Sequence, residues 1–215
     1  HVGHCAVAEH FVQQLHLNSC VFVPTFISPF KIDEPFVADG ARRLSMLKSV
    51  CRTNPRFTVS DVELRRKDVS YTITTLEWFA ERYTNSRLYL LIGEDLLPRF
   101  PQWREWERIM HMTTICVAQR GSVVNEEADN VVQLMRNAGR DPQFLRPPCI
   151  DISSSMIRGM CTRNESLRYL VPDSVRRIIR KHGLYQSVPD VPVIGDTSNT
   201  TNEKGPNRTE EGTLS

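Results

Sequence analysis

No stretch of this sequence approaches the about 18 consecutive apolar residues that a membrane-spanning helix requires, so no membrane segment is expected. The six cysteines include no C-x-x-C pair, and most lie within apolar runs, where a thiol behaves as a small hydrophobic side chain. This pattern favours a reducing compartment, and we expect a cytoplasmic protein. The sequence also has no repeat of solenoid length and no stripe of basic and aromatic residues, so nucleic acid is not an expected partner.

The composition is typical of a globular protein with one domain. Hydrophobic residues make up 40% of the 215 residues and charged residues 24%, and the net charge is only +2. This length is enough for one sizeable core. After Tyr185 the sequence becomes polar and rich in chain breakers, with little to bury. We therefore expect one domain over residues 1–186 and a disordered polar tail over residues 187–215.

Short apolar runs alternate with stretches of helical periodicity along the expected domain. The predicted helices cover residues 3–16, with Val7, Phe11 and Leu15 inward, 38–51, with Leu44, Leu47 and Val50 inward, 71–83 and about 103–110. The predicted strands cover residues 20–24, 57–64, 88–92 and 113–120. This alternation with short connections predicts an α/β fold with a doubly wound parallel sheet, Rossmann-like, whose ligands gather at the carboxyl ends of the strands.

The sequence HVGH, residues 1–4, opens the first predicted helix. Unpaired N–H groups and the helix dipole favour an anion at a helix start. His1 and His4 are three residues apart and share one helical face, and Gly3 allows close approach to the backbone. Such a pair can donate hydrogen bonds to phosphate oxygens as negative charge moves to a leaving pyrophosphate. The alternative is a solvated histidine at the chain terminus.

A second candidate anion site is ISSSMIR, residues 152–158, which places hydroxyl groups and a guanidinium around a helix start. Ser153 or Ser154 is the expected N-cap. Consecutive N–H groups, the hydroxyl donors and Arg158 one turn later would form a phosphate cradle. The alternative is a serine-capped helix with a surface arginine.

Together, HxGH near the start and ISSSMIR near the end resemble the paired signature, HxGH and ISSTxIR, of the nucleotidyltransferase superfamily. The intervening blocks narrow the resemblance to the bacterial-type nicotinate mononucleotide adenylyltransferases. These blocks are FTVSDVELRR with SYTITTLEWF, LYLLIGEDLLPRFPQWREWERI, VAQRG and YLVPDSVRRIIRKHGLY. They occur in the family's order and spacing, and the resemblance extends from His1 to Tyr185.

The resemblance implies a role for each matching residue. The catalytic residues would be His1, His4 and Arg158. The residues that bind ATP would be Gly3, Gly93, Asp95, Ile152, Ser153, Ser154 and Ser155. The residues that bind the mononucleotide would be Lys31, Thr72, Trp103, Arg104 and Arg120. In this assignment the indole of Trp103 stacks on a cationic pyridinium ring, and Asp95 accepts hydrogen bonds from ribose hydroxyls.

Each of these positions also has a purely structural interpretation. Trp103 and Trp106 suit the core side of an amphipathic helix, which is the preferred interpretation for Trp106. Asp95 suits a cap on the turn after a strand, and Arg120 suits a surface charge.

The sequence departs from the family pattern in three places. The family usually reads GxFDPxHxGH, so the resemblance predicts a strand and a glycine-containing loop before His1. We expect that strand to be central in the sheet, so that its absence leaves backbone groups unpaired on both neighbouring strands. Ser155 replaces the usual threonine and keeps the hydroxyl, and Phe30 stands where a histidine usually precedes Lys31.

The implied reaction transfers AMP from ATP to nicotinate mononucleotide and gives deamido-NAD and pyrophosphate, in NAD biosynthesis. The implied cofactor is Mg²⁺ that arrives on ATP, since no cluster of metal-ligating residues is apparent. Two alternatives remain open: a noncatalytic nucleotide-sensing or interaction module on the same fold, and another adenylyltransferase such as the phosphopantetheine enzyme. The expected partners are small-molecule substrates, ATP and nicotinate mononucleotide, without nucleic acid or membrane, and an oligomer is left open.

Overall fold

The computed structural model describes residues 1–30, 38–119 and 126–186. The elements of these residues, in chain order, are α1 (Val2–Gln14), β1 (Cys20–Phe22), α2 (Gly40–Cys51), β2 (Phe57–Val59), α3 (Val62–Arg66), α4 (Thr72–Arg82), β3 (Leu88–Gly93), the 3-10 helix η1 (Glu94–Gln102), α5 (Trp106–Met112), β4 (Thr113–Ala118), α6 (Glu126–Asn137), β5 (Gln143–Leu145), α7 (Ser154–Thr162) and α8 (Asp173–Lys181). No helix among them is long and apolar enough to cross a membrane. The predicted tail, residues 187–215, lies outside the described residues.

All strand pairs of the described residues are parallel. β1 pairs with β2, and β3, β4 and β5 form a second sheet in that order. Because parallel strands need crossover connections, helices separate them along the chain and cover the sheets, as the α/β prediction requires. The other edges of β1 and β3 pair with no strand of the described part.

The residues of β4 show that both faces of the larger sheet are covered. Ile115 and Val117 point to one face and pack in a cluster with side chains of η1, α4, α5 and α6. Cys116 and Ala118 point to the other face and pack against Phe11 of α1. Alternate residues of a strand point to opposite faces, so β4 is buried on both sides, and its last four residues are all apolar. The doubly wound prediction is confirmed.

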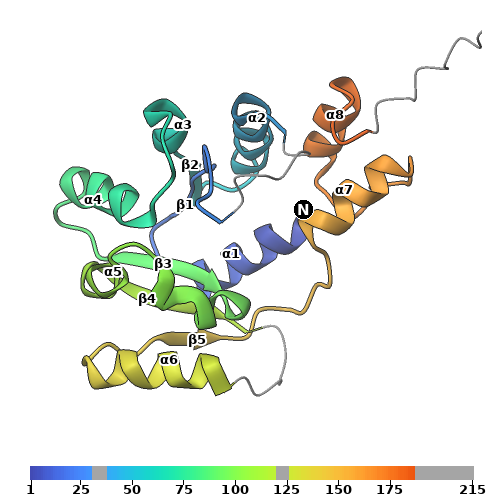
Figure 1. Ribbon diagram of the computed structural model, residues 1–215. Helices are drawn as coiled ribbons and strands as arrows, with labels where there is room; N and C mark the ends of the chain where they lie inside the picture. The colour runs from blue at the N-terminus through green and yellow to red at the C-terminus, as the bar shows by residue number, and fades with distance from the viewer. Residues whose placement is uncertain (31–37, 120–125, 187–215) are drawn as a thin grey trace, which may run out of the picture.

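Helix α1 contacts both sheets and links them (Figure 1). Ala8 and Val12 pack against Phe57 of β2, while Phe11 packs against the β3–β5 sheet. Phe11, Val7 and Leu15 thus form one apolar face, as the helical spacing predicts. The second buried face, formed by Ala8 and Val12, was not predicted from the sequence. Since α1 is held on two sides, its first turn has a fixed position relative to the carboxyl ends of the strands.

The last two helices form a separate cluster with α2. Ile157 of α7 packs with Val175 and Ile179 of α8, and Met46 and Val50 of α2 lie against them. Helix α2 has no fully buried residue, so its predicted inward face is only half-buried. This cluster fixes the start of α7, which carries the serine-rich motif.

One predicted strand is wrong over most of its length. The apolar alternation predicts a strand over residues 57–64, but β2 ends at Val59 and α3 follows from Val62. Ser60 and Asp61 connect them, and Lys67, the C-cap residue of α3, has a left-handed conformation, with φ 57°. A run of eight residues is too short for alternation to distinguish a strand from a strand followed by one helical turn.

The predicted helix over residues 103–110 begins later than expected. Residues 94–102 form η1, which contains Pro98 and Pro101, and α5 begins only at Trp106. Prolines remove the N–H groups that a longer α-helix would use, which explains the 3-10 turns. Trp106 packs against the core cluster, as its structural interpretation predicts.

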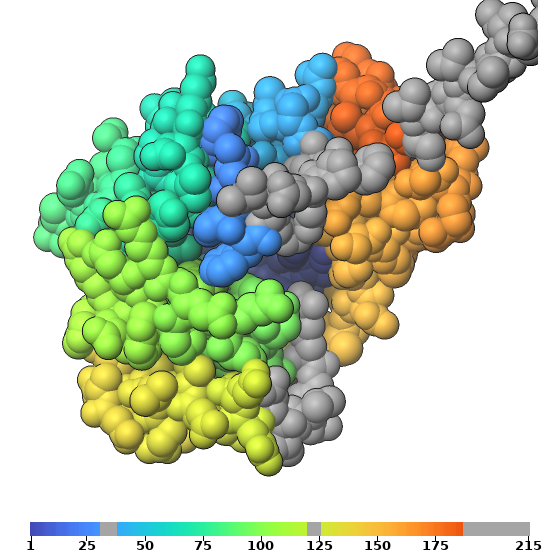
Figure 2. All heavy atoms as spheres, viewed as in Figure 1, coloured from blue at the N-terminus to red at the C-terminus, as the bar shows by residue number. Residues whose placement is uncertain are grey.

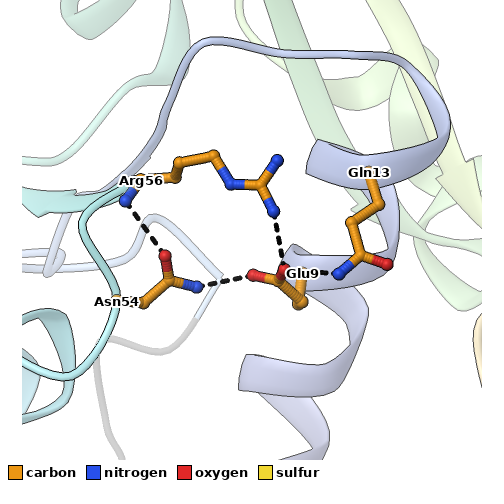
Figure 3. A network of polar contacts seen from close by, with 4 residues as sticks. All are labelled: Glu9, Gln13, Asn54 and Arg56. Carbon is orange, nitrogen blue, oxygen red and sulfur yellow. Dashed lines mark hydrogen bonds and ion pairs between the residues drawn. The ribbon is translucent and has the colours of Figure 1, made fainter.

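A network of polar contacts joins α1 to the segment before β2 (Figure 3). Glu9 accepts hydrogen bonds from Gln13 (2.6 Å), from Asn54 (2.5 Å) and from the guanidinium of Arg56 (2.9 Å). The backbone N–H of Arg56 in turn donates to the Asn54 side chain at 3.0 Å. These donors, with the charge of Arg56, lower the pKa of the Glu9 carboxyl.

We expect Glu9→Gln to lower the melting temperature by about 1–4 °C at pH 7, because the variant loses a networked surface ion pair. A folded-state pKa below the ordinary value stabilises the protein above that ordinary value and ceases to do so as the pH falls through the folded-state pKa. The difference between the two proteins should therefore shrink below about pH 4.5. Thermal denaturation measured from pH 7 to pH 3 tests this, with Glu81→Gln on α4 as an exposed control. A difference that is independent of pH would contradict it.

Candidate functional site

The first turn of α1 places two imidazoles together. His1 is the N-cap residue, and its ring stacks on that of His4 with centroids 3.8 Å apart and planes inclined by 24°. A Cβ atom on Gly3 would lie 3.0 Å from His1 Nδ1, closer than real Cβ contacts normally come. Glycine at this position therefore lets the His1 ring fold back over the helix start.

The charge around this turn favours an anion. Helix α1 has no acidic residue in its first turn, so no carboxylate neutralises the positive end of the helix dipole. His1 Nδ1 is buried and has no hydrogen-bond partner among the described residues. A buried polar nitrogen without a partner is costly, and a ligand that supplies an acceptor would remove the cost.

The start of α7 has the predicted serine cap. Ser153 is the N-cap residue, and its Oγ accepts a hydrogen bond from the N–H of Met156 at 3.0 Å. This bond uses an oxygen lone pair, so the hydroxyl proton of Ser153 remains available for an anion. Ser154 and Ser155 are exposed in the first turn, and the guanidinium of Arg158 donates to Ser155 Oγ at 3.0 Å. The turn thus presents hydroxyl groups and a cation together.

The structure brings the two helix starts together. The N–H of Val2 donates to the carbonyl of Leu170 at 3.0 Å, in the connection between α7 and α8. A Cβ atom on Gly3 would lie 3.7 Å from the carbonyl oxygen of Ile150, which precedes α7 and accepts from the N–H of Ile152. The chain start lies beside α7 in Figure 1, and in Figure 2 the dark blue residues of the first helix lie recessed between orange and green residues.

Gly93 and Asp95 lie at the carboxyl end of β3. Gly93 is the last residue of the strand and the N-cap of η1, and Asp95 is exposed one residue into η1. The Asp95 carboxylate folds back over Gly93, so closely that a Cβ atom on Gly93 would collide with it. The strand end therefore presents an exposed carboxylate above open backbone, which suits hydroxyl donors of a ligand.

A second group of predicted residues lies around the start of α4, where Arg104 contacts Tyr71. Thr72 is the first residue of the helix, and Trp103 follows η1 as its C-cap residue. The Arg104 guanidinium lies over the ring of Tyr71, 4.8 Å from the centroid, which ties the loop after Trp103 to the residue before Thr72. The Trp103 ring is half-buried and packs on Phe100 with centroids 5.3 Å apart. Sequence reasoning missed Tyr71, although an aromatic residue directly before a helix start was a visible signal.

Two predicted residues, Lys31 and Arg120, lie outside the described residues.

Of the hollows on the described surface, one of about 200 Å³ lies at the amino ends of β4 and β5, between Thr113 and Gln143. Another of about 400 Å³ lies by Arg168 and Arg176. Neither contains a predicted site residue, and the chemistry of the helix starts is the better guide because ligands of parallel sheets gather at the carboxyl ends.

The thiols near the sheets do not suit nucleophilic catalysis. Burial raises the pKa of the Cys116 thiol to about 12, and burial with the nearby Cys51 raises that of Cys20 to about 11. Both thiols stay protonated at neutral pH, whereas the thiolate is the nucleophile.

Residues 1–30, 38–119 and 126–186 also contain no group of three or more His, Cys, Asp or Glu side chains that could hold a metal ion.

Comparison with known proteins identifies similar sequences and folds. A family described as cytidylyltransferase-like matches residues 1–160. A probable nicotinate-nucleotide adenylyltransferase of Thermomicrobium roseum is 36% identical over 190 residues, covering 87% of this chain and 87% of the relative. The corresponding protein of Caldicellulosiruptor bescii is 31% identical over 186 residues, covering 86% of this chain and 93% of the relative.

Solved structures show the same fold at lower sequence identity. The Plasmodium falciparum nicotinic acid mononucleotide adenylyltransferase complexed with NaAD has a TM-score of 0.65 and 18% identity, covering 85% of this chain and 89% of that chain. The same enzyme complexed with APC has a TM-score of 0.58 and 16% identity, covering 83% and 90% of the two chains.

Proposed function

The chain belongs to the nicotinate-nucleotide adenylyltransferase family, and from this premise we propose that it transfers AMP from ATP to nicotinate mononucleotide. The products are deamido-NAD and pyrophosphate, and the reaction belongs to NAD biosynthesis. The observation that carries the proposal is that the first turn of α1 lies against the segments on both sides of α7, with the Val2 N–H hydrogen-bonded to the Leu170 carbonyl after α7 and Gly3 close to the Ile150 carbonyl before it. Two anion-binding helix starts at one place suit one triphosphate.

The reaction is an in-line displacement. The 5'-phosphate of the mononucleotide attacks the α-phosphorus of ATP, the bond to the β-phosphate oxygen breaks, and pyrophosphate leaves. Positioning and charge stabilisation account for most of the catalysis in phosphoryl transfer. His1 and His4 donate hydrogen bonds to the oxygens that gain charge, and Arg158 does the same from α7. No covalent intermediate on the protein is needed.

The remaining assignments follow the position of each residue. Ile152, Ser153, Ser154 and Ser155 offer backbone and hydroxyl donors to the triphosphate, Gly3 leaves room at the helix start, and Gly93 and Asp95 hold the ribose of the adenosine. Thr72, Trp103 and the backbone of Arg104 hold the nicotinate ring and its carboxylate. Lys31 and Arg120 are proposed as further phosphate contacts from the family motif alone.

Mg²⁺ is proposed as a cofactor that arrives with ATP. The described residues do not form a ligand cage for it. When bound to the phosphate oxygens of ATP, Mg²⁺ would offset part of their negative charge.

The alternatives differ from this proposal in specific residues. Phosphopantetheine adenylyltransferases normally have threonine at the first position of HxGH, where this chain has His1. A noncatalytic module would not need a stacked histidine pair at the start of α1 together with serine hydroxyls and Arg158 in the first turns of α7. A cytoplasmic location is proposed because buried thiols such as Cys116 and Cys161 persist as thiols in a reducing compartment.

A thermal-shift series tests the proposed ligands. Nicotinate mononucleotide at about a hundredfold excess over its dissociation constant should raise the melting temperature by about 5–10 °C. ATP with Mg²⁺ should also raise it, and nicotinamide mononucleotide at the same concentration should raise it by less than half as much as the acid. An equal response to the acid and the amide would contradict the proposed substrate. Release of pyrophosphate from ATP only when nicotinate mononucleotide is present tests the reaction itself.

A further inference from the structure

The segment directly before α4 is held by backbone contacts to the segment after β1. The N–H of Ser70 donates to the carbonyl of Ile27 at 2.8 Å, and Ser70 Oγ accepts from the N–H of Phe26 at 2.9 Å. Ile27 and Val69 form an isolated parallel bridge. These contacts fix the chain up to Ser70, two residues before Thr72.

The start of α4 is held from a second direction by a buried carboxylate. Glu63 of α3 is 6% exposed, and it is the one acidic side chain that is buried in the described part of the chain. Its Oε1 accepts a hydrogen bond at 2.7 Å from the hydroxyl of Thr75, which is 7% exposed. The N–H of Thr75 donates to the carbonyl of Tyr71 at 3.4 Å. Glu63 is therefore linked through Thr75 to the turn that contains Tyr71 and Thr72.

Stability alone does not explain a carboxylate at this position. Burying a charged group is costly, and replacing a buried polar pair by an apolar pair of similar shape is often neutral or stabilising. The bond between the Thr75 hydroxyl and the Glu63 carboxyl is short, 2.7 Å, and directional, so it fixes how α4 is rotated and placed along its axis relative to α3. Arg66 supports it by donating to Thr75 Oγ1 at 3.5 Å.

Two arginines connect the other side of α4 to the loop after Trp103. Arg104 lies over the Tyr71 ring, and Arg108 forms ion pairs with Glu77 of α4 at 2.7 Å and with Glu105 at 3.0 Å. Glu105 has a left-handed backbone, with φ 54°, so this loop has a defined shape. The position of α4 therefore determines the position of Thr72 and also the distance from Thr72 to Trp103.

We propose that Glu63 is a positioning residue for the nicotinate site, acting through Thr75 on the first turn of α4. The proposal rests on the proposed function. Without the hydrogen bond, the first turn of α4 shifts relative to Trp103, and the ring and carboxylate of nicotinate mononucleotide lose their paired contacts. The phosphate site at α1 and α7 lies on other elements and stays intact.

The experiment compares the wild-type protein with Glu63→Gln, Thr75→Val and Thr75→Ser. Thr75→Val loses the hydrogen bond and should raise the KM for nicotinate mononucleotide roughly tenfold, while the KM for ATP stays within about twofold. Glu63→Gln keeps an acceptor oxygen and should raise the same KM by less. Thr75→Ser keeps the hydroxyl and should restore the wild-type value. Calorimetric titration with nicotinate mononucleotide should show the same ranking without turnover. Glu9→Gln, in the network of Figure 3, is the matched control, because it loses a carboxylate network remote from α4 and should leave both KM values unchanged.

The outcomes distinguish a failure of the positioning role from a failure of the proposed function. An unchanged KM for the mononucleotide in Thr75→Val would overturn the positioning role, as would equal increases in both KM values or a Thr75→Ser variant as impaired as Thr75→Val. A wild-type protein that releases no pyrophosphate from ATP and nicotinate mononucleotide would overturn the proposed function itself. If Glu63→Gln does not fold, the two Thr75 variants still decide the question.

Discussion

Replacing His4 by alanine in the full-length protein should reduce kcat by a factor of about 10²–10³, with a small effect on the KM for ATP. The His4 ring is exposed in the first turn of α1 and stacks on that of His1, with centroids 3.8 Å apart. A donor at this point contributes most when charge accumulates on the leaving pyrophosphate, so its loss raises the barrier more than it weakens ground-state binding.

Steady-state kinetics of pyrophosphate release measure this effect. His10→Ala is the control, because His10 is half-buried on the same helix beside Phe11 and should retain full turnover. His4→Asn keeps a hydrogen-bond donor and should recover part of the lost rate. Wild-type turnover in His4→Ala would show that His4 does not contact the reacting phosphates.

The parts of the fold that the sequence predicts well are those whose pattern extends over many residues. The strand β3 and the helix α4 were expected at nearly their observed bounds, because one is a continuous apolar run and the other has a long helical period. The helix α6 and the strand β5 were not predicted. Helix α6 was detectable, since Ala128, Val131, Val132 and Met135 recur at helical spacing and are buried, whereas β5 has only three residues.

The candidate site could be predicted as separate pieces. The helix dipole at α1 and the serine cap at α7 follow from local sequence, and the structure places both at helix starts. Their contact, and the stacking of Arg104 on Tyr71, depend on tertiary packing between residues far apart in the chain. The burial of Glu63 could not be predicted from the sequence either, because an acidic residue in a short helix is normally expected to be exposed.

Replacing Trp103 by alanine should raise the KM for nicotinate mononucleotide by about 10–30-fold and leave the KM for ATP within about twofold. The indole is half-buried, with one side packed on Phe100, and the resemblance assigns its electron-rich face to the cationic pyridinium ring. Because Trp103 also packs on the core, its loss will lower stability, and stability loss alone can impair an enzyme. Trp106→Ala separates the two effects.

Trp106 packs on the same Phe100 ring, with centroids 6.1 Å apart and an interplanar angle of 80°. Like Trp103 it is partly buried and packs against the core cluster, but no ligand contact is assigned to it, so Trp106→Ala should lower the melting temperature without a selective effect on the mononucleotide. Trp103→Phe keeps an aromatic face and should lie between wild type and Trp103→Ala. Equal KM increases in Trp103→Ala and Trp106→Ala would assign Trp103 to packing alone and place the nicotinate ring elsewhere.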